Sequence, residues 1–313
     1  MSDAVAVNVD NFARAESELA FAATQKDAGG VNTWIHNRVP TPFDRQPVIR
    51  QNRDTLYSGA VVNVSEGATI TIPDAGDRYL SAMVIDQDHY VPHIFHGEGT
   101  HVLSLADSGT EFVLVVVRIL VDPNDADDLA AVNRLQDELV IDARASAAFM
   151  LPSYDLDSMR DTRAHLIGLS RGIGDFRGAF GRRGEVDEIR HLLGSASGWG
   201  GFPESEAVYL NVDPGLPLGE YELTVGDVPV DAFWSITVYN ADGYMVDNPG
   251  HTVSVNSVTA VRDDDGTVTV RFGDSTAPNS IPITEGWNYL VRLYRPRQEV
   301  QSGDYRFPEI VRL

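Results

Sequence analysis

Histidines cluster in one short segment of this chain. Four of its eight histidines lie within thirteen residues that begin at His89, and Asp86 and Tyr90 stand beside the first of them. Imidazole and carboxylate groups together are typical ligands of Zn, Fe, Mn and Cu, and imidazole also transfers protons near neutral pH. We therefore take His89, Asp86 and Tyr90 as candidate catalytic residues. His89, His93 and His96 are the candidate ligands of a divalent metal.

A pocket without metal is the alternative for the same segment. Pro92 interrupts the run of histidines, and the spacing matches no specific metal motif. A loop that crosses a sheet also uses histidines for packing and hydrogen bonding. His89 would then act in proton transfer, with a partner that orients it. The sequence is thus compatible with a divalent metal cofactor and with no cofactor. If a metal binds, Asp86 or Glu98 would supply its oxygen ligand.

Three further residues are candidates for binding a small molecule. Arg53 offers a planar fork for a carboxylate or phosphate, Tyr57 follows it closely, and Trp199 stands among glycines and small residues. We expect the candidate catalytic residues to lie at the mouth of a cavity near Arg53 or Tyr57. The competing interpretations are an internal pair of Arg53 with Asp54, which would fix the loop, and a Trp199 side chain that plugs a domain junction.

The elements before residue 200 must position these groups. Apolar residues at spacings of three and four predict four helices, over residues 8–24, 124–144, 156–169 and 186–195. Short strands with turn residues between them occupy residues 55–121, which is typical of a sandwich or barrel. One of these strands ends at Asp86, where the chain becomes irregular. Loop positions at the end of a rigid sheet often carry function.

The last third of the chain is predicted to be an antiparallel β domain. Aromatic and β-branched residues fill the strand Phe233–Tyr239, and Asp242-Gly243 supplies the positive φ of a two-residue hairpin loop. We expect this strand to be central in its sheet, with Trp234 on the core face. Further strands are predicted over residues 258–261, 267–272 and 287–296, with a turn at 264–266.

The charge of the chain bears on its partners. Its 313 residues include 46 Asp and Glu against 24 Lys and Arg, which gives a formal net charge of −22. Such a surface repels phosphate backbones and anionic head groups, so nucleic acids and membranes are poor partners. A high-salt cytoplasm and a GC-rich genome would each produce this bias, and both explanations stay open.

The chain has no cysteine, which excludes thiol catalysis and all-cysteine iron–sulfur clusters. Its first ten residues carry no Lys or Arg, so we expect no secretory signal. No apolar run approaches the ~18 residues that a membrane helix needs. We expect a soluble cytoplasmic protein that binds a small molecule. A homo-oligomer is compatible with the sequence.

Two long motifs resemble a known family. The segment Asn52-Arg53-Asp54-Thr55-Leu56-Tyr57-Ser58, followed by Gly76-Asp77-Arg78-Tyr79, resembles the start of the DUF1254 domain. The segments Val228–Tyr239 and Asn288–Pro296 resemble the DUF1214 domain that usually follows it. The resemblance runs roughly from residue 46 to the end and implies two jelly-roll-like antiparallel β sandwiches with helical insertions.

Together these observations predict a mainly β chain with an N-terminal helix and a central helical insertion. The expected domains are an N-terminal helix and covering loop over residues 1–45, a DUF1254-like β domain over 46–122, a helical connection over 123–200 and a DUF1214-like β domain over 201–313. Two functions stay open. One is a small-molecule enzyme with a histidine-rich pocket in the first β domain. The alternative is a non-catalytic binding or assembly protein on a double jelly-roll scaffold.

Overall fold

The computed structural model describes residues 4–46, 49–173, 175–250 and 252–313. The chain forms two compact units, each assembled from segments that are separate in the sequence. The first unit comprises residues 1–38, 56–120 and 130–203, and the second comprises 39–55, 121–129 and 204–313. Each unit has its own sheets and its own buried apolar clusters, and each is described by itself.

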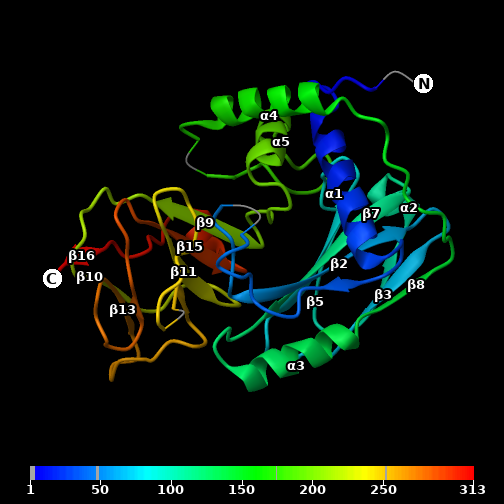
Figure 1. The fold of residues 1–313 in the computed structure, drawn as a ribbon. Helices are drawn as coiled ribbons and strands as arrows, with labels where there is room; N and C mark the ends of the chain where they lie inside the picture. Colours follow the sequence, from blue (N-terminus) through cyan, green and yellow to red (C-terminus); the bar gives the residue numbers. More distant parts are fainter. Residues whose placement is uncertain (1–3, 47–48, 174, 251) are drawn as a thin grey trace. The chain divides into compact units, whose positions relative to one another are not determined.

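The elements of the chain are named in sequence order in Figure 1. The helices are α1 (Phe12–Ala28), α2 (Leu105–Ser108), α3 (Ala126–Asp137), α4 (Leu156–Ser170), α5 (Glu188–Ser197) and α6 (Gln298–Gln301). The first eight strands are β1 (Ile35–His36), β2 (Thr55–Asn63), β3 (Ala68–Ile72), β4 (Leu80–Asp86), β5 (His93–His96), β6 (Gly99–Leu103), β7 (Phe112–Leu120) and β8 (Val140–Ala143). The others are β9 (Ala207–Val212), β10 (Tyr221–Val225), β11 (Trp234–Tyr239), β12 (Ser254–Asn256), β13 (Val268–Phe272), β14 (Ser280–Ile281), β15 (Asn288–Tyr294) and β16 (Val311–Arg312).

The first unit contains two sheets. The larger has the strand order β1-β2-β7-β4-β5, and the smaller has the order β6-β3-β8. Strand β4 is antiparallel to both of its neighbours and is buried along its whole length. Its residues from Leu80 to Ile85 are almost all apolar, as expected for a strand covered on both faces. The central position of β4 fixes the place of Asp86 at its end.

Three helices of the first unit pack together beside these sheets. Phe12 and Ala15 of α1, Met159 and Leu166 of α4 and Leu193 of α5 share one buried apolar cluster. Figure 1 shows these three helices gathered on the same side. Helix α1 also contributes to a second cluster, which includes apolar side chains of β2 and β7. The helices therefore have a rigid support from which to hold groups near the end of β4.

The second unit is a β sandwich. One sheet has the order β12-β11-β15-β9 and the other β14-β13-β10-β16, and all pairs are antiparallel except β13 with β14. Alternate residues of β11 and β15 share one buried cluster with alternate residues of β10 and β13. Trp234, Ile236 and Val238 belong to this core. The expected face of Trp234 and the central position of β11 are thus confirmed.

The opposite face of β11 and β15 holds a buried arginine. Arg292 of β15 donates from Nη1 to Thr237 Oγ1 at 2.8 Å, and from Nη2 to Tyr239 Oη at 2.8 Å and to the carbonyl of Arg50 at 2.9 Å. Tyr239 Oη in turn donates to the carbonyl of Gln51 at 2.8 Å. These bonds fasten the segment before β2 to a sheet formed mainly by the last third of the chain.

The structure is mainly β with antiparallel sheets, as predicted, but three local predictions were wrong. The helix over 124–144 ends at Asp137, and residues 140–143 form β8 instead, which pairs with β3. Residues 258–261 form no strand. Gly243, with φ 85°, does lie in a tight turn, closed by bonds between Asn240 and Tyr244, but the next strand begins only at Ser254. The predicted two-residue hairpin is therefore a turn within a longer connection.

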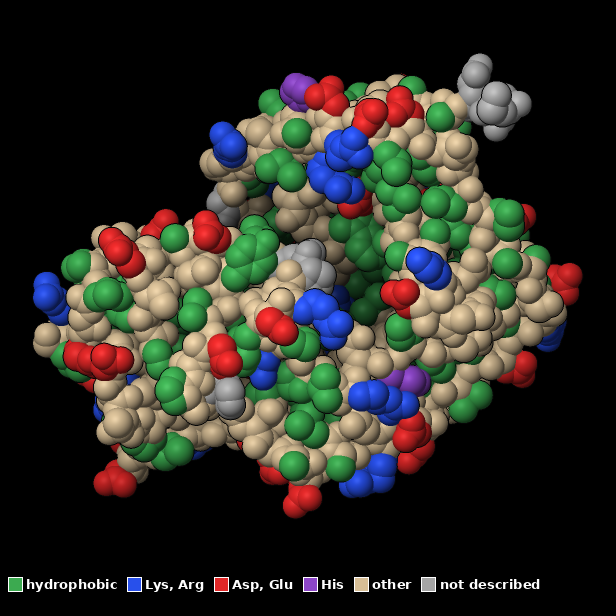
Figure 2. Space-filling view, viewed as in Figure 1, with side chains coloured by type: hydrophobic (Ala, Val, Ile, Leu, Met, Phe, Trp, Pro, Cys, Tyr) green, Lys and Arg blue, Asp and Glu red, His purple; other side chains and the backbone are tan. Residues whose placement is uncertain are grey.

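Within the described ranges, no helix combines the length and apolar character needed to span a membrane. Acidic side chains are spread over the face shown in Figure 2, with basic ones between them, rather than gathered in one patch. On this face the acidic charge is therefore distributed and not concentrated in one site.

Candidate functional site

A pocket of about 330 Å³ lies in the first unit where β4 ends. Three segments form its wall: the end of β4 with the following loop, the short helix α2, and the loop before α5. The lining residues are Asp86, Tyr90, Pro92, His93, Ala106, Asp107, Ser108, Gly109, Arg182 and Arg183. Most of them can carry charge or a hydrogen bond, and the rest of the wall is apolar, so the pocket suits a small ligand that carries a polar or charged group.

Asp86 is the most buried acidic group in this pocket, with 2% of its surface exposed. Its Oδ1 accepts hydrogen bonds from the backbone N–H groups of Asp88 and Tyr90, both at 2.8 Å. Its Oδ2 lies 3.7 Å from Nη2 of Arg183. Burial raises the pKa of Asp86 to about 6, although the bond from the Tyr90 N–H opposes the shift. The carboxyl group can therefore take up or release a proton near neutral pH.

Two adjacent arginines stand beside this carboxyl group. Arg183 donates to Asp88 Oδ2 at 2.6 Å, and its guanidinium lies over the Tyr90 ring, 4.2 Å from the ring centroid. The side chain of Arg182 makes no hydrogen bond or ion pair with any residue that the structure describes. Its charge is close enough to contribute to lowering the pKa of His93. Arg183 is thus held in place, whereas Arg182 is available for an anion.

His93 is the imidazole of the pocket. Burial is the main cause that lowers its pKa, and Asp107, whose Oδ2 is 4.0 Å from Nε2, opposes the shift. The Nε2 atom is buried and has no hydrogen-bond partner among the described residues. Tyr90 completes the wall, and its hydroxyl donates to Glu188 Oε2 at 3.2 Å. Asp86 and His93 are therefore two proton-exchanging groups in one pocket wall.

His89 lies beneath this wall rather than in it. Its ring is 1% exposed and is stacked on Trp199 at a centroid distance of 5.2 Å. The Gly200 N–H donates to Nε2 at 2.9 Å, so the proton of the neutral ring is on Nδ1, which donates to Ser195 Oγ at 2.8 Å. The Ser195 hydroxyl in turn donates to the His191 carbonyl at 2.8 Å. Burial lowers the pKa of His89 to about 3, so both nitrogens of this ring serve as structural hydrogen-bonding groups.

The backbone at His89 explains how the chain reaches this arrangement. Its φ is 70°, a left-handed conformation that costs energy in a residue with a Cβ. The Asp86 carboxyl group closes the turn by accepting two backbone N–H groups, and the buried bonds of the imidazole hold the strained residue. The turn directs Tyr90 and His93 to the pocket and His89 to the interior.

The other residues predicted for the site lie elsewhere. His96 Nδ1 lies 3.2 Å from the carbonyl oxygen of Leu80. Tyr57 belongs to the first unit, with its ring centroid 5.4 Å from the Arg118 guanidinium. Arg53 belongs to the second unit and lines a different pocket. Among the residues that the structure describes, no three side chains of metal-ligating type come together, so His89, His93 and His96 do not share a site.

Sequence reasoning missed the arginines of the site. Arg182 and Arg183 lie between Gly181 and Gly184 in the loop before α5, a segment for which the sequence analysis predicted no functional residue. The hydrogen bond from the Val91 N–H to the Gly181 carbonyl, at 2.8 Å, brings this loop to the end of β4. An adjacent pair of cations in a chain with few basic residues was the available signal.

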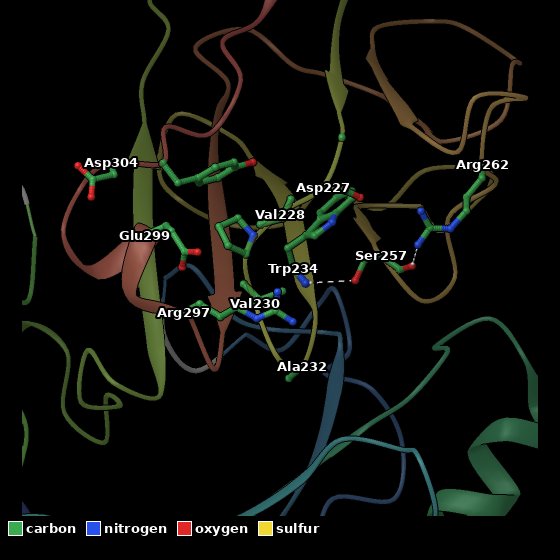
Figure 3. A pocket seen from close by; sticks show the side chains of 13 residues that line it. Asp227, Val228, Val230, Ala232, Trp234, Ser257, Arg262, Arg297, Glu299 and Asp304 are labelled. Atoms are coloured by element: carbon green, nitrogen blue, oxygen red, sulfur yellow. Dashed lines mark hydrogen bonds between the residues drawn. The ribbon is translucent and has the colours of Figure 1, made fainter.

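A larger pocket, of about 650 Å³, lies in the second unit (Figure 3). Trp234 and Ser257 lie at one side of it, and Arg297 and Glu299 at another. Arg297 is paired with Asp231 at 2.6 Å, and Arg262 donates to the carbonyls of Gly266 and Ser257. Its cations therefore have partners within the protein, which favours the smaller pocket of the first unit as the candidate site.

Comparison with known proteins agrees with the two motifs. Residues 31–100 match the family described as "Protein of unknown function (DUF1254)", and residues 217–298 match "Protein of unknown function (DUF1214)". No curated protein matches the chain.

Two solved structures show the same fold. The VPA0106 protein from Vibrio parahaemolyticus is 19% identical, with a TM-score of 0.75 and 97% of each chain covered. A putative uncharacterized protein from Burkholderia cenocepacia is 14% identical, with a TM-score of 0.53, and the match covers 97% of this chain and 88% of that one. At these identities the likeness concerns the fold alone.

Proposed function

The chain belongs to the family that joins a DUF1254 domain to a DUF1214 domain, and the descriptions of both domains assign no reaction. We therefore propose its function from the pocket at the end of β4. The protein is a small-molecule enzyme that moves a proton on an anionic substrate. The observation that carries this proposal is the presence of Asp86, His93 and Arg182 in one pocket wall.

Arg182 supports the anionic character of the substrate. A guanidinium without a protein partner presents its N–H donors to a carboxylate or phosphate. The pocket volume of about 330 Å³ fits a molecule of metabolite size. Arg183 is occupied by Asp88, so its part is to fix the Tyr90 ring and to face the negative charge of the ionised Asp86.

Asp86 supports the proton transfer. A general base works best when its pKa lies near the working pH, and burial brings the pKa of this carboxyl group to about 6. Its Oδ1 is held by two backbone N–H groups, which leaves Oδ2 to exchange the proton. His93, with its unpartnered Nε2, is the second group that can give or take a proton.

Solvent deuterium exchange tests this proposal without knowledge of the substrate. Small carboxylated and phosphorylated carbonyl compounds would be incubated with the protein in D2O, and loss of their proton signals would be followed by NMR. We expect exchange that rises as the pH passes about 6, because Asp86 acts as a base once it is ionised. Asp86→Asn should abolish this exchange, and Arg182→Gln should raise KM more than it lowers kcat.

Arg144→Gln is the matched control, because Arg144 is an exposed arginine of the same unit outside the pocket. It should leave exchange unchanged. An absence of exchange for every compound, together with equal affinity of the wild type and Arg182→Gln for acetate, would contradict the proposal.

Binding without turnover is the alternative function, and one observation favours it. The Asp86 Oδ1 bonds close the turn that positions His89, which is a structural task. A ligand that Arg182→Gln releases, but whose protons never exchange with D2O, would identify a binding protein. For either function we propose a cytoplasmic location and a jelly-roll connectivity of the sheets.

A further inference from the structure

A second pocket, of about 860 Å³, lies in the second unit around Arg53. Its wall is mostly apolar and comes from the loop before β2, the segment before α3 and the connection after β11. The lining residues are Pro40, Pro42, Phe43, Asp44, Arg53, Pro123, Asn124, Met245, Val246 and Asp247. Arg53 is the single cation among them.

Arg53 is a buried cation whose hydrogen-bonding capacity is mostly unused. The residue is 7% exposed, and its guanidinium lies over the Phe43 ring, 4.2 Å from the ring centroid. Nη1 donates to the carbonyl of Thr41 at 2.5 Å, and this is its one hydrogen bond among the described residues. Nε is buried without a partner. A guanidinium has five N–H donors, so those of Nη2, which is neither bonded within the described residues nor buried, remain for a ligand.

No carboxylate of the described residues pairs with this arginine. Asp54, the neighbour expected to pair with it, instead accepts hydrogen bonds from Ser254 and Asn256. Burial lowers the pKa of Arg53, and the charge of Asp247 opposes this without a direct contact. A charge held out of water without a counter-ion is costly, and a bound anion would remove that cost.

The walls of the pocket are tied together before any ligand arrives. The Gln46 side chain donates to the carbonyls of Phe43 and Met245, at 2.9 and 2.8 Å, and accepts from the Met245 N–H at 2.9 Å. Three prolines stiffen the remaining wall. The loop that carries Phe43 and the connection that carries Met245 therefore form a fixed frame around Arg53.

We propose that this pocket binds a small organic monocarboxylate with an apolar body. The carboxylate would accept hydrogen bonds from Nη2 of Arg53, and the body would lie against the prolines, Phe43 and Met245. Asp44 and Asp247 would repel a phosphate dianion, and the single cation matches a single negative charge. This site is independent of the pocket at the end of β4.

Benzoate and its neutral analogue benzamide are the probes for this site. Both would be titrated into the full chain by calorimetry, while the Arg53 Nε–H signal is followed by NMR. We expect benzoate to bind about tenfold or more tightly than benzamide, because neutral benzamide lacks the charge-assisted contact with Arg53. Benzoate should also shift the Arg53 signal. Arg53→Lys keeps the charge but loses the planar fork, so it should weaken benzoate binding by a similar factor.

Two more variants separate recognition from folding and from the first pocket. Asp247→Asn removes a negative charge near Arg53, so it should strengthen benzoate binding several-fold, a gain that a folding defect would not produce. Arg182→Gln should leave the benzoate-induced shift of the Arg53 Nε–H signal unchanged. Equal binding of benzoate and benzamide, wild-type affinity in Arg53→Lys, or loss of that shift in Arg182→Gln would each overturn the proposal.

Discussion

Replacing Asp86 by Asn should make the first unit more stable at neutral pH than the wild type. The pKa of Asp86 is raised from 3.8 to about 6 in the folded protein because the carboxyl group is buried. A raised pKa means that the protonated form favours folding. Its contribution is fully present below pH 3.8 and is lost as the pH rises through about 6. An Asn side chain stays neutral throughout and can accept the same two backbone N–H bonds.

The size of the effect follows from the shift. A change of about two pKa units corresponds to about 3 kcal/mol of unfolding free energy. The stability difference between Asp86→Asn and the wild type should therefore grow by about this amount between pH 3.5 and 7.5. The 3.7 Å contact of Oδ2 with Arg183, which the variant loses, opposes the gain and is already contained in the pKa.

Urea unfolding with pulsed hydrogen exchange measures this difference for the first unit alone. Peptides from β4 and β7 report the fraction unfolded at each urea concentration and pH. Glu98→Gln, at an exposed position of the same unit, serves to subtract the effect of one lost formal charge. A stability difference that stays constant from pH 3.5 to 7.5 would show that burial does not raise the pKa of Asp86, and the proposed base would lose its physical support.

Three other outcomes are expected. Trp234→Ala should cost the second unit ~3–5 kcal/mol in urea unfolding, because Trp234 is 4% exposed in the sandwich core; a loss below about 1 kcal/mol would contradict its core position. Gly201→Ala should destabilise the first unit by about 1–3 kcal/mol, since a Cβ there would overlap the Phe180 ring. Gly168→Ala, in α4 with no atom within 4 Å of the added Cβ, should be neutral or stabilising by up to about 1 kcal/mol. The melting temperature should rise from low to molar KCl because salt screens the net charge of −22, and a flat response would favour genome composition as the origin of the acidic bias.

The sequence predicted elements well where one local signal dominates. The β-branched and aromatic run of β11 identified a central strand, and the apolar spacing over residues 8–24 identified the helix α1. The prediction failed at Val140–Ala143, where apolar residues continue the helical spacing of α3. This segment forms a strand because it pairs with β3, which lies some 70 residues earlier in the sequence.

The candidate site was predictable in part for the same reason. Asp86 and Tyr90 were found because they follow a buried strand, and His93 because it lies in the histidine cluster. The role of His89 depends on Ser195 and Gly200, more than 100 positions later, and no local pattern announces those bonds. Arg53 was assigned to the wrong pocket because sequence proximity to the first β region does not show which compact unit a loop joins.

The hydrogen bonds of Arg292 set a limit on how this chain can be divided. A fragment that begins at residue 204 would keep β11 and β15 but lose the carbonyls of Arg50 and Gln51, which Nη2 contacts at 2.9 and 3.4 Å. Its guanidinium would then lose both acceptors, and hydrogen bonds to a charged group contribute about 1.5–3 kcal/mol each. The segment that matches the DUF1214 family, residues 217–298, is accordingly shorter than the compact unit that contains it. A recombinant second unit would need the segment 39–55 supplied as part of the same chain, for example by circular permutation, rather than a simple cut before β9.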